Sequence, residues 1–132
     1  MTAQQILQST GSRAANLGQV AETIDALKEC EGDSTACAAA MMALADTSMT
    51  AATHAALDCA DVCGSTARVL ARTPAPDSRV IHGVLEATIA AVERSASECG
   101  RHADHHEHCR VMSESGRRAA DASRRALNGF PA

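Results

Sequence analysis

Apolar residues recur at the spacing of an α-helix along most of this chain. From about residue 19 one stripe contains Val20, Ile24, Leu27, Cys30, Cys37, Met41 and Leu44. A second stripe contains Val80, Val84, Leu85, Ile89 and Val92. Between them, residues 73–77 read Thr-Pro-Ala-Pro-Asp, and two prolines cannot lie inside a helix. The pattern predicts long helices, with a non-helical connector at residues 73–77.

The side chains available for a core also favour helices. The chain has no Trp, no Tyr and a single Phe, Phe130, so Ala, Leu, Val, Ile and Met must fill the interior. Sheets draw on β-branched and aromatic residues, whereas Ala is the best helix former and lets helices approach closely. We therefore expect an all-α protein.

Capping and turn residues divide the chain further. Thr2-x-x-Gln5 resembles a capping box and predicts a short helix over residues 2–11. A long helix follows, with a weak point at residues 31–34 where it could break, and Ser48 or Thr50 caps the next, which runs to about Arg72. Asp77 or Ser78 caps a third bundle helix, and a fourth runs from about His105 to Leu127. The prediction is a single domain, residues 1–132, containing an antiparallel up-down-up-down four-helix bundle over about 19–127 and a short extra N-terminal helix.

Residues 99–109 contain four of the six histidines and two of the six cysteines. Thiolate and imidazole are ligands for Cu(I) and Zn(II), so this segment indicates a metal site. Cys99-x-x-His102 and His106-x-x-Cys109 would span roughly 15 Å on one straight helix, but they can converge if the chain reverses between them. We expect His102 and His106 to be ligands and His105 and His108 to face solvent.

The predicted topology gathers every soft donor in the half of the bundle nearest the histidines. Cys59 and Cys63 lie one helical turn apart, and Cys30 and Cys37 lie two turns apart with Ser34 between them. An alternative for such cysteines is packing as small buried apolar residues. The opposite half has only core candidates, among them Val20, Leu70, Val80, Leu85 and Ala119. The candidate metal ligands are Cys30, Cys37, Cys59, Cys63, Cys99, Cys109, His102, His106, Met41, Met112 and His54.

Several function classes fit the chain poorly. The net charge of −4 and the lack of aromatic residues argue against a nucleic-acid partner. No run of about 18 apolar residues is present, so no membrane span is expected. The first ten residues have no signal-peptide pattern, which favours the cytoplasm and cysteines used as thiolates, not disulfides. No phosphate loop, nucleophile elbow or di-iron motif is present, and no catalytic residue is assigned.

Two segments resemble the cysteine-rich four-helix-bundle copper storage protein family. Residues 57–63 read Leu-Asp-Cys-Ala-Asp-Val-Cys, and residues 97–110 read Ser-Glu-Cys-Gly-Arg-His-Ala-Asp-His-His-Glu-His-Cys-Arg. The resemblance extends over roughly residues 20–127. It implies a bundle whose thiolates hold many Cu(I) ions, a homo-oligomer that is usually a tetramer, and a cytosolic location for members without an export signal.

The chain also departs from that family. Where relatives repeat cysteine, it has Ser34, Met41, Leu85, Thr88, Val92, Ser95, Met112, Gly116, Ala119 and Ser123. Six thiolates would hold only a handful of Cu(I) ions. Because these departures from the family leave the thiols near the histidines, we expect a single defined metal site at that end. The expected function is a cytosolic copper-binding protein for buffering, sequestration or delivery, with zinc as the rival metal. One alternative is a copper-dependent oxidase or oxygenase built on the same fold. Another is a copper-responsive repressor, which the acidic net charge disfavours because a repressor needs a basic surface to bind DNA.

Overall fold

The computed structural model describes Gln5, residues 17–72 and residues 77–130. Within these residues the chain forms α2 (Leu17–Leu44), the 3₁₀-helix η1 (Thr47–Met49), α3 (Thr50–Leu70), α4 (Ser78–Gly100) and α5 (Glu107–Asn128), with no strand. The all-α prediction is confirmed. The predicted short helix over residues 2–11 lies, except for Gln5, outside the described part of the chain.

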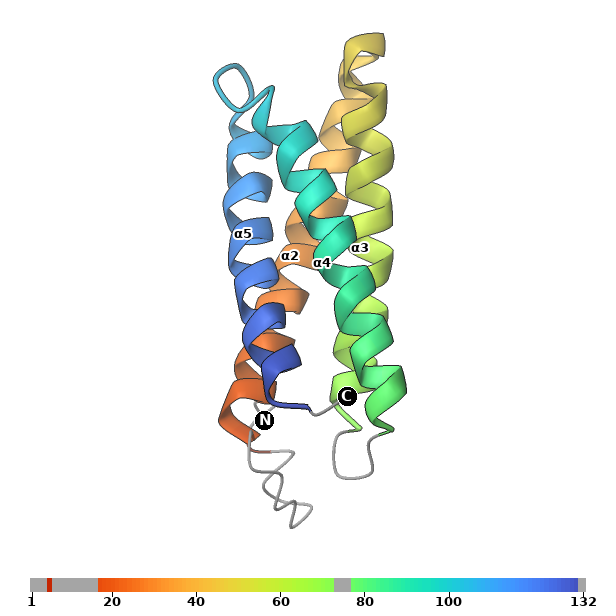
Figure 1. Cartoon of the computed structure of the whole chain (residues 1–132). Helices are drawn as coiled ribbons and strands as arrows, with labels where there is room; N and C mark the ends of the chain where they lie inside the picture. Colours follow the sequence, from red (N-terminus) through yellow and green to blue (C-terminus); the bar gives the residue numbers. More distant parts are fainter. Residues whose placement is uncertain (1–4, 6–16, 73–76, 131–132) are drawn as a thin grey trace.

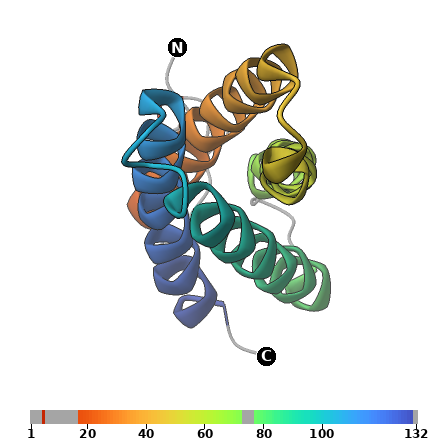
Figure 2. The ribbon, with the colours of Figure 1, turned by 90° about the horizontal axis from the view of Figure 1, so that it is seen from above.

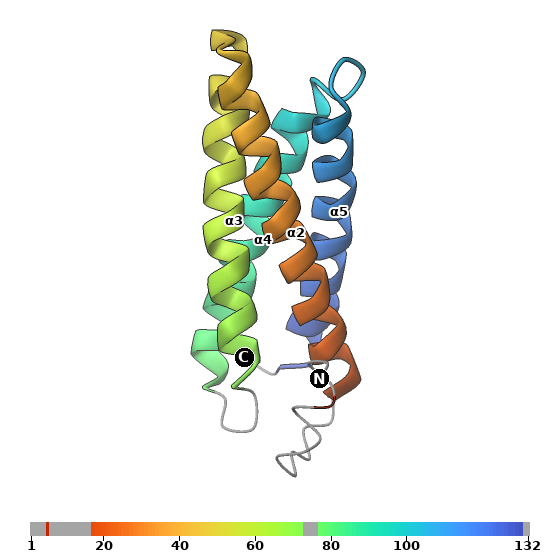
Figure 3. The ribbon, with the colours of Figure 1, turned by 180° about the vertical axis from the view of Figure 1, so that it is seen from behind.

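The four long helices lie side by side (Figure 1). The α2–α3 turn and the α4–α5 connector are at one end, which we call the histidine end, while Leu17, Leu70, Ser78 and Phe130 are at the other. Helix α2 packs on α3 and α5, and α4 packs on the same two helices. The view down the bundle in Figure 2 and the reverse view in Figure 3 show this closed arrangement. No described helix is long and apolar enough to cross a membrane.

The helix boundaries follow local side-chain chemistry. Ala45 has a φ of 52° and ends α2. The Asp46 carboxylate then accepts the N–H of Ser48 over 2.9 Å and caps η1, so Ser48 lies inside the short 3₁₀ turn and α3 starts at Thr50. Asp77 accepts the N–H groups of Arg79 and Val80 and caps α4, as predicted. Helix α2 continues through residues 31–34 without a break.

The half of the bundle away from the histidine end is an ordinary core. Val20, Leu70, Leu85 and Ala119 are fully buried there, as predicted. The prediction for Val80 was wrong, because Val80 is 50% exposed and its neighbour Ile81 is buried instead. Buried hydroxyl groups pair within the interior: the Thr66 and Thr88 Oγ1 atoms are 2.7 Å apart, and Thr88 donates to the Val84 carbonyl. Those pairs satisfy polar groups that burial would otherwise penalise.

Candidate metal centre

All six cysteines are buried and none forms a disulfide. They divide into two groups of three, and within each group the sulfur atoms lie within 4.8 Å of one another. We call Cys30, Cys59 and Cys63 the inner group, and Cys37, Cys99 and Cys109 the outer group. The described residues therefore provide two clusters of three thiols, where the sequence led us to expect a single defined site.

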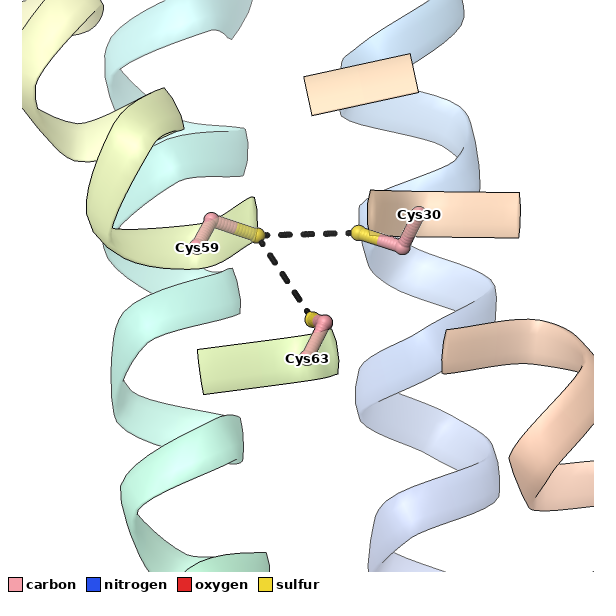
Figure 4. Close-up of side chains that lie close together, drawn as sticks. All are labelled: Cys30, Cys59 and Cys63. Atoms are coloured by element: carbon pink, nitrogen blue, oxygen red, sulfur yellow. Dashed lines mark hydrogen bonds between the residues drawn. The ribbon is translucent and has the colours of Figure 1, made fainter. Parts of the chain in front are cut away.

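The inner group joins two helices (Figure 4). Cys30 projects from α2, and Cys59 and Cys63 project from successive turns of α3. Cys59 Sγ is 3.6 Å from Cys30 Sγ and 3.9 Å from Cys63 Sγ. The Ser34 hydroxyl lies 3.4 Å from Cys59 Sγ and 3.7 Å from Cys30 Sγ. All three cysteines and Ser34 have no solvent exposure, so this group is closed off from water.

Hydrogen bonds inside the inner group favour one thiolate and two thiols. The pKa of Cys59 is lowered because Cys30, Cys63 and Ser34 can all donate to its sulfur. The pKa of Cys30 is raised to about 12, mainly by its hydrogen bond with Cys59, and that of Cys63 is raised through its contacts with Cys30 and Cys59. A metal that binds three thiolates here must displace the remaining protons, so its affinity depends on pH.

The outer group joins three helices at the histidine end. Cys37 comes from α2, Cys99 from the last turn of α4, and Cys109 from the first turn of α5. His108 Nδ1 lies 3.3 Å from Cys37 Sγ and 3.5 Å from Cys109 Sγ. The prediction that His108 faces solvent was wrong, because its half-buried ring points at two thiols.

The outer group, like the inner one, favours one thiolate and two thiols. The pKa of Cys99 is lowered, chiefly because the Cys37 thiol donates to it, and the pKa of Cys37 is raised by the same bond and by burial. Burial raises the pKa of Cys109 to about 11. Burial, followed by the nearby charge of His106, lowers the pKa of His108. His108 is therefore held in the neutral form, in which a ring nitrogen can bind a metal.

The other predicted ligands surround these groups without joining them. His102 and His106 are half-buried, and the His106 ring lies 5.3 Å from that of His108 between centroids. Met41 is buried, and it also lines a surface cavity of about 380 Å³ together with the exposed His54. The Met112 sulfur accepts a hydrogen bond from Ser95 over 3.3 Å.

Three residues that interact with the thiols were not predicted from the sequence to do so: His108, Ser34 and Ser95. Both serines stand one helical turn from a cysteine of the group they serve, Ser34 after Cys30 and Ser95 before Cys99. Ser34 is one of the donors to Cys59, and the Ser95 hydroxyl also helps to lower the pKa of Cys99. The i,i+4 spacing of serine and cysteine was the available signal.

Comparisons with known proteins agree with this geometry. The family described as copper storage protein matches residues 16–128. A solved copper storage protein, Ccsp, from Streptomyces lividans loaded with 10 copper equivalents is 34% identical, with a TM-score of 0.90 over 97% of this chain and 99% of that chain. A structure of the cytosolic copper storage protein from the same organism with five coppers is 37% identical, with a TM-score of 0.81 over 86% and 96% of the two chains. No curated protein matches this chain.

Proposed function

The chain belongs to the copper storage protein family, and we propose that it binds a few Cu(I) ions through its two thiol groups to buffer, sequester or deliver copper. The observation that carries the proposal is the division of six buried, unpaired cysteines into two groups of three with metal-binding separations. Thiolates are soft ligands that select Cu(I). The cargo is therefore Cu(I), with zinc as the rival metal.

The capacity of this chain is small compared with that of a bundle lined with cysteine. The relative that carries 10 copper equivalents matches nearly the whole chain, yet this chain has six cysteines in all. The half away from the histidine end is filled by apolar residues and a few buried hydroxyl groups. Copper is therefore confined to the half that holds the inner and outer groups.

We assign the six cysteines as the main ligands, with the histidines and methionines of the histidine end in supporting roles. His108, in the first turn of α5, is the histidine in contact with the thiols, while His102 and His106 lie in the α4–α5 connector and would meet copper as it enters. Met41 follows Cys37 by one turn and lines the neighbouring cavity with His54, so this pair is placed to pass copper inward. Met112 is fully buried and accepts a hydrogen bond from Ser95, and the second lone pair of its sulfur remains available to copper.

The same family membership supports the wider setting. We propose a cytosolic location, since a matching structure is of a cytosolic copper storage protein. We also propose a homo-oligomer, a tetramer as the family resemblance implies. Residues 1–132 would form one domain, an antiparallel up-down-up-down bundle preceded by a short N-terminal helix. The alternative of a copper-dependent oxidative enzyme gains no support from the comparisons, and the closed inner group leaves no room for a substrate.

A competition titration tests the proposal. Reduced, metal-free protein is titrated with Cu(I) in the presence of a chromophoric Cu(I) chelator, and the copper withheld from the chelator is counted. We expect tight binding of a small number of ions, which is lost when Cys59→Ser and Cys99→Ser are combined. Failure of the unaltered protein to withhold any copper would refute the proposal.

A further inference from the structure

The two thiol groups differ in the fourth side chain, which in each group lies close to two of the three sulfurs. The inner group is completed by the Ser34 hydroxyl, and the outer group by the His108 imidazole. A neutral hydroxyl is a poor ligand for a soft metal, whereas imidazole is a good ligand for zinc. The outer group therefore presents three thiols and one imidazole nitrogen, which is a known set for tetrahedral Zn(II).

We infer that Cys37, Cys99, Cys109 and His108 form a Zn(II) site that is filled when copper is absent. The inference does not depend on copper binding elsewhere in the chain. It assigns the histidine end a second metal and a structural role, because the four ligands come from α2, α4 and α5. Zinc bound there would tie these three helices together at the histidine end of the bundle.

Two sulfur–nitrogen separations in the outer group already fit this ion. Zn–S and Zn–N bonds of about 2.3 Å and 2.0–2.1 Å give tetrahedral edges of about 3.8 Å between sulfurs and about 3.5 Å between sulfur and nitrogen. His108 Nδ1 is 3.3 Å from Cys37 Sγ and 3.5 Å from Cys109 Sγ. The three sulfurs lie within 4.8 Å of one another. The two sulfur–nitrogen separations match tetrahedral edges, and the imidazole must also move toward Cys99 Sγ to complete the tetrahedron, because the group whose atoms all lie within 4.8 Å contains the three sulfurs alone.

The inner group does not meet the same requirement. The fourth side chain in contact with its sulfurs is the Ser34 hydroxyl, whereas the His108 imidazole contacts two sulfurs of the outer group. Structural zinc sites are almost always four-coordinate, whereas Cu(I) accepts three thiolates. The two groups should therefore separate the metals, with zinc in the outer group alone. Cu(I), which is softer and favoured by thiolates, would then displace zinc from the outer group as copper becomes available.

Co(II) is a suitable probe, because tetrahedral Co(II) with thiolate ligands has intense visible bands and a sulfur-to-metal charge-transfer band. Reduced, metal-free full-length protein is titrated with Co(II), and Zn(II) is then added to displace it. We expect one Co(II) per chain with a tetrahedral spectrum that Zn(II) abolishes. Cys99→Ser should abolish the spectrum, and His108→Ala should shift it and weaken Zn(II) binding by about tenfold or more.

Two variants serve as matched controls. Cys63→Ser removes an inner thiol, and His105→Ala removes an exposed histidine of the same connector, so both should keep the spectrum and the Zn(II) affinity. Far-ultraviolet circular dichroism confirms that each variant remains helical. The inference is overturned if the unaltered protein gives no tetrahedral spectrum, if the spectrum survives Cys99→Ser, or if His108→Ala and His105→Ala behave alike.

The same samples distinguish this inference from the proposed function. Cu(I) is added to the Co(II)-loaded protein with a Cu(I) chelator present as reporter. Protein that retains Cu(I) but never shows the tetrahedral spectrum keeps the copper function and refutes the zinc site. Protein that shows the spectrum but withholds no Cu(I) supports the zinc site and refutes copper binding.

Discussion

The Ser34 hydroxyl donates a hydrogen bond to Cys59 Sγ over 3.4 Å, so a serine occupies the fourth position around the inner thiol group. Ser34 is also 3.7 Å from Cys30 Sγ and fully buried. Its hydroxyl helps to hold Cys59 as a thiolate, yet it adds no sulfur ligand. This one contact both organises the inner group and limits it to three thiolates.

Replacing Ser34 by cysteine should therefore raise the number of Cu(I) ions that the chain binds. The new sulfur would lie within reach of Cys30 and Cys59, which supplies a fourth thiolate to the inner group. The measurement is the Cu(I) stoichiometry in competition with a chromophoric chelator. Ser34→Ala is the matched control and should leave the number unchanged, so an equal count in the cysteine and alanine variants would contradict this view of Ser34.

The metal-free protein should lose stability in alkaline solution. The pKa values of Cys30 and Cys109 are raised to about 12 and about 11, and those of Cys37 and Cys63 are raised as well. An unfolded thiol has a pKa of about 8.5, so above this pH the unfolded chain loses protons that the folded chain keeps. The stabilising effect of the protonated thiols is complete below about pH 8.5 and is lost as the pH rises toward their folded pKa values.

Thermal unfolding of reduced protein between about pH 8 and pH 11 checks this expectation. Each buried thiol that keeps its proton should lower the free energy of unfolding by up to about 1.4 kcal/mol per pH unit. The lowered pKa values of Cys59 and Cys99 act in the opposite direction, but only near pH 8.5, where the unfolded thiols are still partly protonated. Cys30→Ala should flatten the dependence, and an identical slope in that variant would argue against the assignment.

The half of the bundle away from the histidine end should affect stability without affecting copper. Leu85 is fully buried there, so Leu85→Ala should lower the free energy of unfolding by about 2–5 kcal/mol. Denaturant unfolding measures the loss, and Leu57→Ala, at a position 39% exposed, is the control with an expected change near 0.5 kcal/mol. The Cu(I) stoichiometry of folded Leu85→Ala should equal that of the unaltered protein. A smaller number of bound Cu(I) ions in this variant would mean that the half of the bundle away from the histidine end takes part in copper binding.

The sequence predicted the helices well because their signals are local. Periodic apolar residues, the Asp77 cap and the two prolines each act over a few residues, and the structure follows them. The facing of individual side chains was harder to predict. Val80 was predicted to be buried, but Val80 is exposed and the adjacent Ile81 is buried. Adjacent residues are about 100° apart around a helix, so a small error in helix rotation changes which of them faces the core.

The same limit explains the histidines and the thiol groups. Helix α5 starts at Glu107, so His106 is an extended cap residue and His108 is the one that turns toward Cys37. The gathering of soft donors at one end followed from chain direction and helix rise alone. Their division into two groups depends on helix rotation and side-chain rotamers, which arise from packing between distant segments and leave no local signal.

Native mass spectrometry of the Cu(I)-loaded protein is the most direct test that the two thiol groups hold the copper. The masses of the unaltered chain, Cys59→Ser, Cys99→Ser and the combined variant are recorded after excess copper is removed by a weak chelator. We predict that each single variant retains fewer copper ions than the unaltered chain and that the combined variant retains none. Equal copper counts in the unaltered chain and the combined variant would contradict the central claim.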